Sequence, residues 1–518
     1  METHMNGAES LVRTLLAGDV DVCFTNPGTS EMHFVAALDK IDGMRCVLCL
    51  FEGVASGAAD GYARMAGKPA STLLHLGPGL GNALANLHNA KKARSPIVNI
   101  VGEHATYHIQ YNTPLTSDIE GIARPVSGWV KTSKDAASVG ADGAEAIAAA
   151  RVTPGQVATL ILPANTAWGD GGVIGETPEV PQPEPVDDQA VEKAAAMLRD
   201  GTTSLLILGA DALYEEPLAI AGDIVAATGC AVLAEGMNKR IQRGAGRFAV
   251  DRIPYPVAKA LDLLSPYQRI VLVGAGQPAA FFAYPDTPSL VTREGAELST
   301  LAKPDQDCVG ALRALADAVG AKSGAAQLQS AARPSRPIGP ITLDSIAASI
   351  GALLPENAIV VDESVTTGRG FLPVTAGAPP HDWLQNRGGS IGLGLPMATG
   401  AAVACPDRKV VCLESDGSGM YCVQSLWTQA REGLDVTTLL FANRSYNILK
   451  GELANVGAGN PGPRANDMLT LDRPTLDWVE IAGGMGVEAE RVESADALCR
   501  AFERGLAVEG PYLIEVVI

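Results

Sequence analysis

The chain has 518 residues, and its 39 basic and 58 acidic side chains give a net charge of −19. A strongly acidic protein repels phosphate backbones, which argues against nucleic acid as the main partner. No apolar run reaches the roughly 18 residues that a membrane helix needs, and the first residues lack the basic and apolar regions of a signal peptide. We therefore expect a cytoplasmic protein of about three domains, at roughly 150 residues per domain.

The nine cysteines are scattered, mostly among apolar residues, which is typical of a reducing compartment. Cys46 and Cys49 form a CxxC pair, a pattern that can bind zinc or carry out redox chemistry, but no second pair lies near it. We expect both side chains to be buried in a strand.

Three successive blocks of the chain alternate short apolar strands with alanine-rich helices. This alternation predicts an α/β fold of three doubly wound parallel-sheet domains. The proline-rich segments near 176–188 and 322–340 are typical of linkers. The predicted domains are therefore 1–180, 188–322 and 340–518, which we call the N-terminal, central and C-terminal domains.

Two glycine-rich turns follow predicted strands, one beginning at Gly77 and one at Gly274. Neither completes the G-x-G-x-x-G pattern of a dinucleotide site, because Asn82 and Ala279 stand at the third glycine position. We interpret them as tight turns at the carboxyl ends of parallel strands, where an open α/β sheet binds ligands.

The most informative segment is 408–449, in which one predicted strand ends at Asp416 and the next at Asn443. Neighbouring parallel strands bring these ends to one edge of a sheet. A carboxylate, an amide oxygen and a backbone carbonyl then form a hard-oxygen site suited to Mg²⁺ or Ca²⁺, with positions left for phosphate oxygens. Gly417 and Ser418 open a helix whose N–H groups suit an anion. Either feature alone would be an ordinary turn, but the two together favour a metal site.

At these residues the sequence resembles the thiamine-diphosphate (ThDP) enzymes, whose signature is GDG followed by a metal-sharing Asn. Ser415 stands where the first glycine is usual, which we expect to alter the turn and leave metal binding intact. The resemblance implies ThDP and Mg²⁺ as cofactors, with Asp416, Asn443 and Ser445 as metal ligands.

The segment CLFEGVASGAADGYARMAGKPA closely resembles the part of that family that carries its activating glutamate, which makes Glu52 the counterpart. Phe51 stands where His is frequent. In the family this carboxyl group shares a proton with N1′ of the cofactor's pyrimidine, whose imino form then removes the C2 proton of the thiazolium. Such a role needs a carboxyl group in a low-dielectric cleft with a raised pKa. The alternative is a helix N-cap, for which Glu is not a preferred residue.

Nearly the whole chain resembles the acetolactate synthase and benzoylformate decarboxylase branch of the family. The segment TNPGTSEMHF implies that Thr29 faces the substrate. The segment VDESVTTG implies that Val365 and Thr366 contact the diphosphate. In GGSIGLGLP, the resemblance implies that Gly389 offers its carbonyl to the 4′-amino group and that Ile391 is the apolar wedge that holds the cofactor bent.

The resemblance implies decarboxylation of a 2-oxo acid, through ylide attack on the carbonyl, loss of CO₂ and protonation of the resulting enamine. An acetolactate-synthase-like carboligase, which joins the enamine to a second carbonyl compound, stays open. Leu115 stands where those synthases carry a catalytic Gln and weighs against it. A 2-hydroxyacyl thioester lyase would need a basic patch for coenzyme A, and none is convincing. Retention of Glu52, Asp416 and Asn443 argues against a silent homologue. We find no reason to place FAD in the central domain, so we expect it to be absent or non-catalytic.

His75 ends the predicted strand 71–76, where a side chain can face the ligand crevice of the sheet. Benzoylformate decarboxylases carry a His in the matching segment, which implies a catalytic acid or base; the alternative is a structural His. Glu103 and His104 are weaker candidates. In the family the cofactor lies between the first domain of one subunit and the third of another. We therefore expect a homodimer as the minimum and a homotetramer as the complete assembly, with a small 2-oxo acid or aldehyde as substrate and no nucleic-acid or membrane partner.

Overall fold

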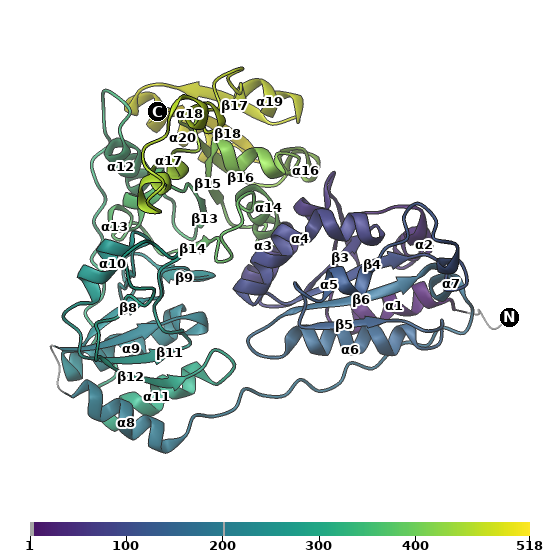
Figure 1. The fold of residues 1–518 in the computed structure, drawn as a ribbon, viewed down its shortest axis with the longest axis horizontal. Coiled ribbons are helices and arrows are strands. Elements are labelled where there is room, and N and C mark those ends of the chain that lie inside the picture. Colours follow the sequence, from purple (N-terminus) through teal and green to yellow (C-terminus); the bar gives the residue numbers. More distant parts are fainter. Residues whose placement is uncertain (1–4, 200–202) are drawn as a thin grey trace.

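The computed structural model describes residues 5–199 and 203–518 and has three α/β domains, each built around its own sheet (Figure 1). The predicted fold class is confirmed, because every strand pair but one is parallel and helices cover both faces of the sheets. Within the described residues no helix is long and apolar enough to cross a membrane.

The N-terminal domain is a six-stranded sheet in the order β2-β1-β3-β4-β6-β5. Its two faces are covered by different helices: Phe24 packs in the cluster that includes α3 and α4, whereas the adjacent Cys23 packs in the cluster that includes α1 and α6. This double covering explains the nearly continuous apolar strands. The elements are β1 (Val22–Asn26), β2 (Arg45–Leu48), β3 (Ala70–Leu74), β4 (Ile97–Glu103), β5 (Trp129–Thr132) and β6 (Val157–Pro163), with α1 (Gly7–Ala17), η1 (Thr29–Glu31), α2 (Met32–Lys40), α3 (Glu52–Ala66), α4 (Leu76–Ala93), η2 (Ile109–Tyr111), α5 (Ile119–Ala123), α6 (Val139–Arg151) and α7 (Ala164–Trp168).

The central domain is a five-stranded parallel sheet in the order β10-β8-β7-β11-β12. Between α7 and α8, a fully described stretch, the chain contains neither helix nor sheet strand and crosses from the N-terminal to the central domain (Figure 1). The elements are β7 (Ser204–Leu208), β8 (Ala231–Ala234), β10 (Asp251–Arg252), β11 (Arg269–Val273) and β12 (Glu297–Ala302), with α8 (Asp188–Leu198), η4 (Ala210–Leu213), α9 (Glu215–Thr228), α10 (Val257–Leu264) and α11 (Cys308–Val319).

The C-terminal domain has a seven-stranded sheet in the order β17-β18-β16-β15-β13-β14-β9. Its edge strand β9 (Arg240–Arg243) comes from the central part of the chain and pairs antiparallel with β14. The other strands are β13 (Ile359–Glu363), β14 (His381–Gln385), β15 (Val410–Ser415), β16 (Val436–Ala442), β17 (Glu488–Val492) and β18 (Tyr512–Val517). The helices are α12 (Leu343–Leu353), η5 (Thr367–Gly370), α13 (Phe371–Val374), α14 (Gly394–Ala404), α15 (Asp416–Gly419), η6 (Met420–Cys422), α16 (Ser425–Glu432), α17 (Asn447–Asn455), α18 (Pro463–Met468), α19 (Trp478–Gly484) and α20 (Ala495–Ala507).

The N-terminal and C-terminal domains meet where α3 packs against α14. A β-carbon on Gly61 would lie 2.1 Å from the carbonyl oxygen of Met397, and one on Gly400 would lie 1.8 Å from that of Ala58. Only glycine allows the two backbones to approach this closely. The glycine- and alanine-rich character of these segments therefore serves a tight contact between domains, and both helices begin beside the candidate active site.

The expectation that Cys46 and Cys49 are both buried is wrong for Cys46. All nine cysteines are free thiols, and Cys49 is buried, but Cys46 is exposed. The reason is that β2 is the edge strand of its sheet, so its residues are covered less completely than those of the inner strands.

Candidate active site

Three loops at the carboxyl edge of the N-terminal sheet carry the residues predicted there. Thr29 begins η1 after β1, Glu52 begins α3 after β2, and His75 is the N-cap of α4 after β3. Because β1 pairs in parallel with both β2 and β3, the three loops emerge at the same edge. Thr29 is exposed, Glu52 is buried and His75 is half-buried.

The carboxyl group of Glu52 faces the beginning of α4. Its Oε2 accepts a hydrogen bond from Nδ2 of Asn82 at 2.9 Å. A β-carbon on Gly79 would lie 3.1 Å from Oε1 of Glu52 and 3.3 Å from Cβ of His75, so both residues border the same glycine. Glu52 and His75 are therefore close neighbours at the start of α4, and a carboxyl group and an imidazole are among the groups that general acid–base catalysis uses most.

Glu31, which the sequence analysis did not single out, holds His75 in place. Nδ1 of His75 lies 2.7 Å from Oε2 of Glu31, and the same oxygen accepts the N–H of Gly28 at 2.8 Å. Burial raises the pKa of Glu31, and the contact with His75 lowers it in part. With Nδ1–H as the donor to this carboxyl group, Nε2 of His75 is left to exchange a proton with a ligand.

The segment that follows β4 adds two more histidines near His75. Burial lowers the pKa of His104, and the charges of His108 and His75 lower it further, so His104 is neutral near pH 7. Glu103 is buried and accepts the N–H of His104 at 2.6 Å. Leu115, in the same segment, is exposed. Of the two weaker candidates, His104 therefore lies near His75, and Glu103 is bonded to the backbone of His104.

The predicted metal residues lie at the carboxyl ends of the paired strands β15 and β16. Asp416 directly follows β15, Asn443 directly follows β16, and Oδ2 of Asp416 accepts the N–H of Arg444 at 2.5 Å. Burial raises the pKa of Asp416 to about 6. Oδ1 of Asn443 accepts the N–H of Ser445 at 2.9 Å. One buried carboxyl group and one amide oxygen thus come together at this edge, which fits a hard divalent cation.

The helix expected after Asp416 differs from the prediction. It is the four-residue α15, it starts at Asp416 itself, and the N–H of Gly417 is bonded to Oδ1 of Asp416 at 2.8 Å. The hydroxyl of Ser418 donates to Glu414 at 2.6 Å. These groups already have partners inside the loop, because the chain turns immediately into a second short helix.

The predicted diphosphate loop connects β13 to η5. Val365 lies in this loop with a φ of 50°, a left-handed backbone that is uncommon for a β-branched residue. Thr366 is the N-cap residue of η5. Since β13 pairs directly with β15, this loop and the Asp416 loop share one edge of the sheet.

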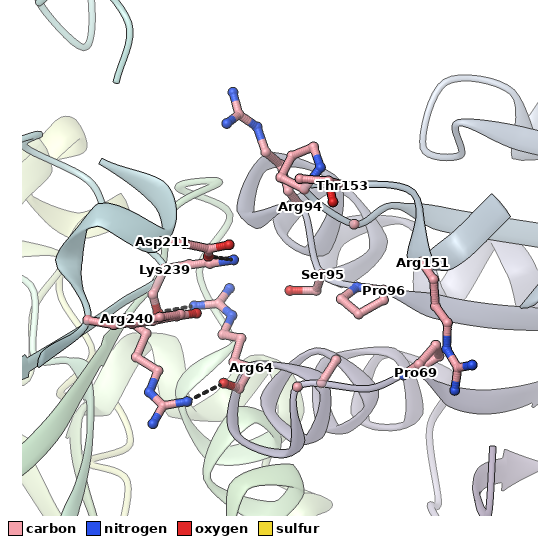
Figure 2. A pocket seen from close by; sticks show the side chains of 15 residues that line it. Arg64, Pro69, Arg94, Ser95, Pro96, Arg151, Thr153, Asp211, Lys239 and Arg240 are labelled. Carbon is pink, nitrogen blue, oxygen red and sulfur yellow. Dashed lines mark hydrogen bonds and ion pairs between the residues drawn. The ribbon is translucent and has the colours of Figure 1, made fainter. Parts of the chain in front are cut away.

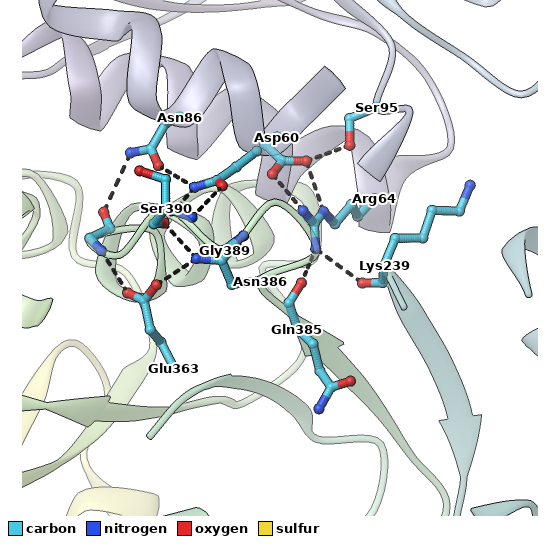
Figure 3. A network of polar contacts seen from close by, with 12 residues as sticks. Asp60, Arg64, Asn86, Ser95, Lys239, Glu363, Gln385, Asn386, Gly389 and Ser390 are labelled. Carbon is cyan, nitrogen blue, oxygen red and sulfur yellow. Dashed lines mark hydrogen bonds and ion pairs between the residues drawn. The ribbon is translucent and has the colours of Figure 1, made fainter. Parts of the chain in front are cut away.

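The predicted pyrimidine-binding segment, GGSIGLGLP, begins between β14 and α14 and runs into α14. The turn Asn386–Gly392, which contains its first five residues and which we call the pyrimidine-binding turn, contacts α4 of the N-terminal domain (Figure 3). Gly389 has a φ of 79°, which favours glycine, and Ile391 is half-buried. Nδ2 of Asn86 donates to the carbonyl of Gly53 at 2.8 Å and reaches the carbonyl of Gly392 at 3.4 Å. The residue that follows Glu52 and the pyrimidine-binding turn are therefore linked through one amide within the same chain.

The polar residues of α4 were missed although the sequence contains a signal for them. Asn82, Asn86 and Asn89 lie on one side of the helix, at a spacing of four and three residues. Asn82 binds Glu52, Asn86 binds Gly53, and Asn89 donates to the carbonyl of Ser390 at 2.8 Å. A row of amides with helical spacing, directly after the predicted His75 turn, is a pattern that marks a polar contact surface.

A second cavity, of about 320 Å³, lies between the N-terminal and central domains and is lined by several cations (Figure 2). Three of these cations already have acidic partners. Lys239 pairs with Asp211 at 2.9 Å, Arg240 with Asp382 at 2.6 Å and Arg64 with Asp60 at 2.6 Å. Because the charges of these cations are already paired, we do not assign the cavity to the reaction.

Among the described residues, no three His, Cys, Asp or Glu side chains group together as a metal centre. A site of the kind predicted here, with one carboxylate, one amide and one backbone carbonyl, contains only one such side chain. The donor set at Asp416 and Asn443 therefore fits a cation whose remaining ligands come from a bound phosphate group.

Comparisons with known proteins agree with this arrangement. Residues 5–122 match the family model described as "Thiamine pyrophosphate enzyme, N-terminal TPP binding domain", and residues 371–516 match its C-terminal TPP binding domain. A protein of Mycobacterium tuberculosis named "Putative acetolactate synthase large subunit IlvX" is 53% identical over 99% of both chains. The benzoylformate decarboxylase of Pseudomonas aeruginosa is 28% identical over 95% of both chains.

The fold is also similar to that of a solved structure. The ThDP-dependent 4-hydroxybenzoylformate decarboxylase of Rhodococcus jostii superposes with a TM-score of 0.85, covering 99% of this chain and 98% of that one, at 24% identity. The two matching domains are the ones whose loops carry Glu52 and Asp416. The chain therefore belongs to the thiamine-diphosphate-dependent enzymes and is related to both acetolactate synthases and benzoylformate decarboxylases.

Proposed function

We propose that this enzyme decarboxylates a 2-oxo acid with the help of ThDP and Mg²⁺, and releases an aldehyde. The observation that carries the proposal is the Glu31–His75 contact beside Glu52. An aldehyde product requires that a proton be delivered to the reacting carbon after CO₂ has left. A half-buried imidazole that is held by a carboxyl group is suited to that delivery.

Bound ThDP supplies a nucleophilic carbon for the carbonyl and an electron sink for the pair left when CO₂ departs. Asp416, Asn443 and the carbonyl of Ser445 would hold Mg²⁺ at the diphosphate. Glu52 would share its proton with the pyrimidine, since its carboxyl group is buried and its side-chain partner is the amide of Asn82.

The remaining predicted contacts follow from where each residue lies. Val365, Thr366, Gly417 and Ser418 border the shared edge of β13 and β15 and would contact the diphosphate. Gly389 would receive the 4′-amino group and Ile391 would support the bend of the cofactor, because both lie in the turn that contacts α4. Thr29 is exposed in the loop next to Glu31 and would face the substrate.

Carboligation is the second candidate function, and a specific contact favours it. A β-carbon on Gly389 would lie 2.5 Å from Cζ of Phe281, so an apolar side chain of the central domain covers the pyrimidine-binding turn. A phenylalanine there delivers no proton, which would leave the reacting carbon free to join a second carbonyl compound. The M. tuberculosis relative, which is named as a synthase, supports the same alternative.

We further propose that the enzyme works in the cytoplasm as a homodimer or homotetramer, on a small 2-oxo acid or aldehyde. The nine free thiols favour a reducing compartment. Leu50, Met420 and Tyr421 are exposed apolar residues close in sequence to Glu52 and Ser418. A second subunit that completes the site would cover them.

The test is to incubate the enzyme with ThDP, Mg²⁺ and a panel of 2-oxo acids while measuring CO₂, aldehydes and acyloins.

His75→Ala should keep ThDP binding but slow aldehyde formation about a hundredfold, the usual scale for a positioned acid or base. Glu31→Gln should cause a smaller loss, because the imidazole remains. His33→Ala is the matched control, since His33 packs against Trp168. Near-normal aldehyde formation in His75→Ala, or acyloins as the main product of the parent, would shift the assignment to carboligation.

A further inference from the structure

A buried carboxyl group outside the predicted catalytic set lies directly behind the pyrimidine-binding turn. Glu363 is the last residue of β13, and its relative exposure is only 4%. Among the described residues, no Lys, Arg or His side chain forms an ion pair with Glu363. The cost of burying such a group is offset only if its oxygens accept hydrogen bonds, so its partners define what it does.

Three N–H groups converge on Glu363, and all three belong to the turn or its continuation. Figure 3 shows Glu363 beneath the turn with its bond to Asn386. Oε2 accepts the backbone N–H of Gly392 at 3.1 Å and that of Gly394 at 2.8 Å. Oε1 accepts Nδ2 of Asn386 at 2.8 Å. One carboxyl group thus holds both ends of the turn Asn386–Gly392.

Asn386 connects Glu363 to the middle of the turn by further hydrogen bonds. Its Oδ1 accepts the N–H of Gly389 at 2.9 Å, and its Nδ2 donates to the carbonyl of Ser390 at 2.6 Å. The shape of the backbone around Gly389 therefore depends on Glu363 through one intervening amide. The same turn is held from the other side by Asn89, whose Oδ1 accepts the N–H of Ser390 at 3.1 Å.

We propose that Glu363 is a positioning residue, whose carboxylate holds the turn Asn386–Gly392 in the shape that receives the pyrimidine of ThDP. This inference rests on the proposed function, because it concerns the same cofactor site. A carboxylate suits the task better than any neutral side chain of its size, since it accepts several N–H bonds at once.

Because Glu363 must be charged to hold the turn, we expect the affinity for ThDP to depend on pH. Burial raises the pKa of Glu363 to about 7, although the three N–H donors lower it in part. The titratable groups that face it are Glu414, Cys412 and Cys422, and none of them is a cation. As the pH falls, the buried pair Glu363 and Glu414 takes up protons; once Glu363 is protonated, one of its oxygens becomes a donor and its hold on the turn weakens.

The test measures ThDP binding in the presence of saturating Mg²⁺, by calorimetry between pH 6 and pH 8.5. Glu363→Gln keeps the size of the side chain but presents an amide NH₂ to backbone N–H groups. It should weaken ThDP binding at pH 8 at least tenfold and flatten the change in affinity between pH 6 and pH 8.5 relative to the parent. Glu363→Asp keeps the charge and should retain more affinity than Glu363→Gln, together with a pH dependence. Asp223→Asn, which removes a buried carboxyl group that also accepts backbone N–H groups but lies in the central domain, is the control.

Parental affinity and an unchanged pH profile in Glu363→Gln would overturn the inference while leaving the proposed function standing. Equal losses in Glu363→Gln and Asp223→Asn would also overturn it, because they would indicate a general effect of losing a buried acid. If the parent itself does not bind ThDP with Mg²⁺, the proposed function and this inference fall together. If Glu363→Gln does not fold, Asn386→Ala replaces it and should show the same loss of affinity, since it cuts the contact from Glu363 to Gly389.

Discussion

Asp416 is a buried carboxyl group that pairs with no cation in the described part of the chain. Its two oxygens accept backbone N–H groups from its own loop and from the residue after Asn443. Burial raises its pKa and the nearby charge of Glu515 adds to the rise, so the ionised form is poorly compensated without a metal. Of the side chains at this site, Asp416 is therefore the one whose ionised form a divalent cation would stabilise most.

Asp416→Ala should therefore abolish the thermal stabilisation that ThDP and Mg²⁺ give to the parent. A ligand present at a hundred times its Kd stabilises a protein by about 2.7 kcal/mol, and the variant should lose that increment. Differential scanning fluorimetry with and without cofactor measures it. Asp407→Ala, in an exposed turn, is the control and should respond like the parent. An undiminished shift in Asp416→Ala would rule out the metal assignment.

At this scale the sequence predicted single residues better than their partners. Glu52, His75, Asp416 and Asn443 each stand at the end of a strand, which local patterns can locate. Glu31 was missed because its importance comes from a contact with His75, 44 residues away. The partners of Glu363 lie between 23 and 31 residues away, and no spacing rule predicts such a contact.

At the scale of elements, α3 is where the domains are joined. Arg64, near its end, forms an ion pair with Asp60 in which both side chains are fully buried. The same guanidinium donates to the carbonyl of Gln385 at 2.6 Å and to that of Lys239 at 3.1 Å (Figure 3). One side chain of the N-terminal domain thus contacts the strand that precedes the pyrimidine-binding turn and a segment of the central part of the chain.

Arg64→Ala should destabilise the enzyme by about 3–5 kcal/mol, because it leaves Asp60 buried without a counter-charge. Denaturant unfolding, followed by tryptophan fluorescence, measures the change. Arg124→Ala is the matched control, since Arg124 forms the same i,i+4 pair with Glu120 on the surface. The control should cost at most about 0.5 kcal/mol. Equal effects of the two substitutions would mean that the burial of Arg64 and its bonds to Gln385 and Lys239 add no stability.

The elements that the sequence did not predict are strands with polar composition. β14 has the sequence HDWLQ, β17 has EAERV and β9 has RIQR, so none shows the apolar run of a buried parallel strand. β17 and β9 lie at the two edges of the C-terminal sheet. Charged β14 residues are compensated by ion pairs, as Asp382 is by Arg240 and Arg408. The residues that neutralise these charges lie in distant segments of the chain, so a local sequence pattern cannot reveal them.

At the scale of the whole molecule, the question is how many subunits build one site. Within one chain, Asn86 already connects Gly53 to the pyrimidine-binding turn. The family resemblance, by contrast, implies that Glu52 and Asp416 act together across two subunits. The exposed apolar residues beside both loops favour the second arrangement.

Mixing two inactive variants distinguishes the arrangements. In a dimer of one Glu52→Gln subunit and one Asp416→Ala subunit, sites built across subunits include one site with both residues intact. Co-expression and purification of this mixed dimer should therefore restore up to half the parental turnover per dimer, whereas each variant alone stays inactive. A mixed dimer that remains inactive would place each site within a single chain.

The most direct test of the whole account is the rate at which the C2 proton of bound ThDP exchanges with deuterium. The parent should exchange this proton rapidly, because Glu52 activates the pyrimidine that removes it. Glu52→Gln should bind ThDP with nearly parental affinity and exchange about a hundred to ten thousand times more slowly, the range over which a positioned acid or base acts. Quenched-flow exchange read by proton NMR gives both rates. Exchange in Glu52→Gln as fast as in the parent would contradict the assignment of this residue and of the active site built around it.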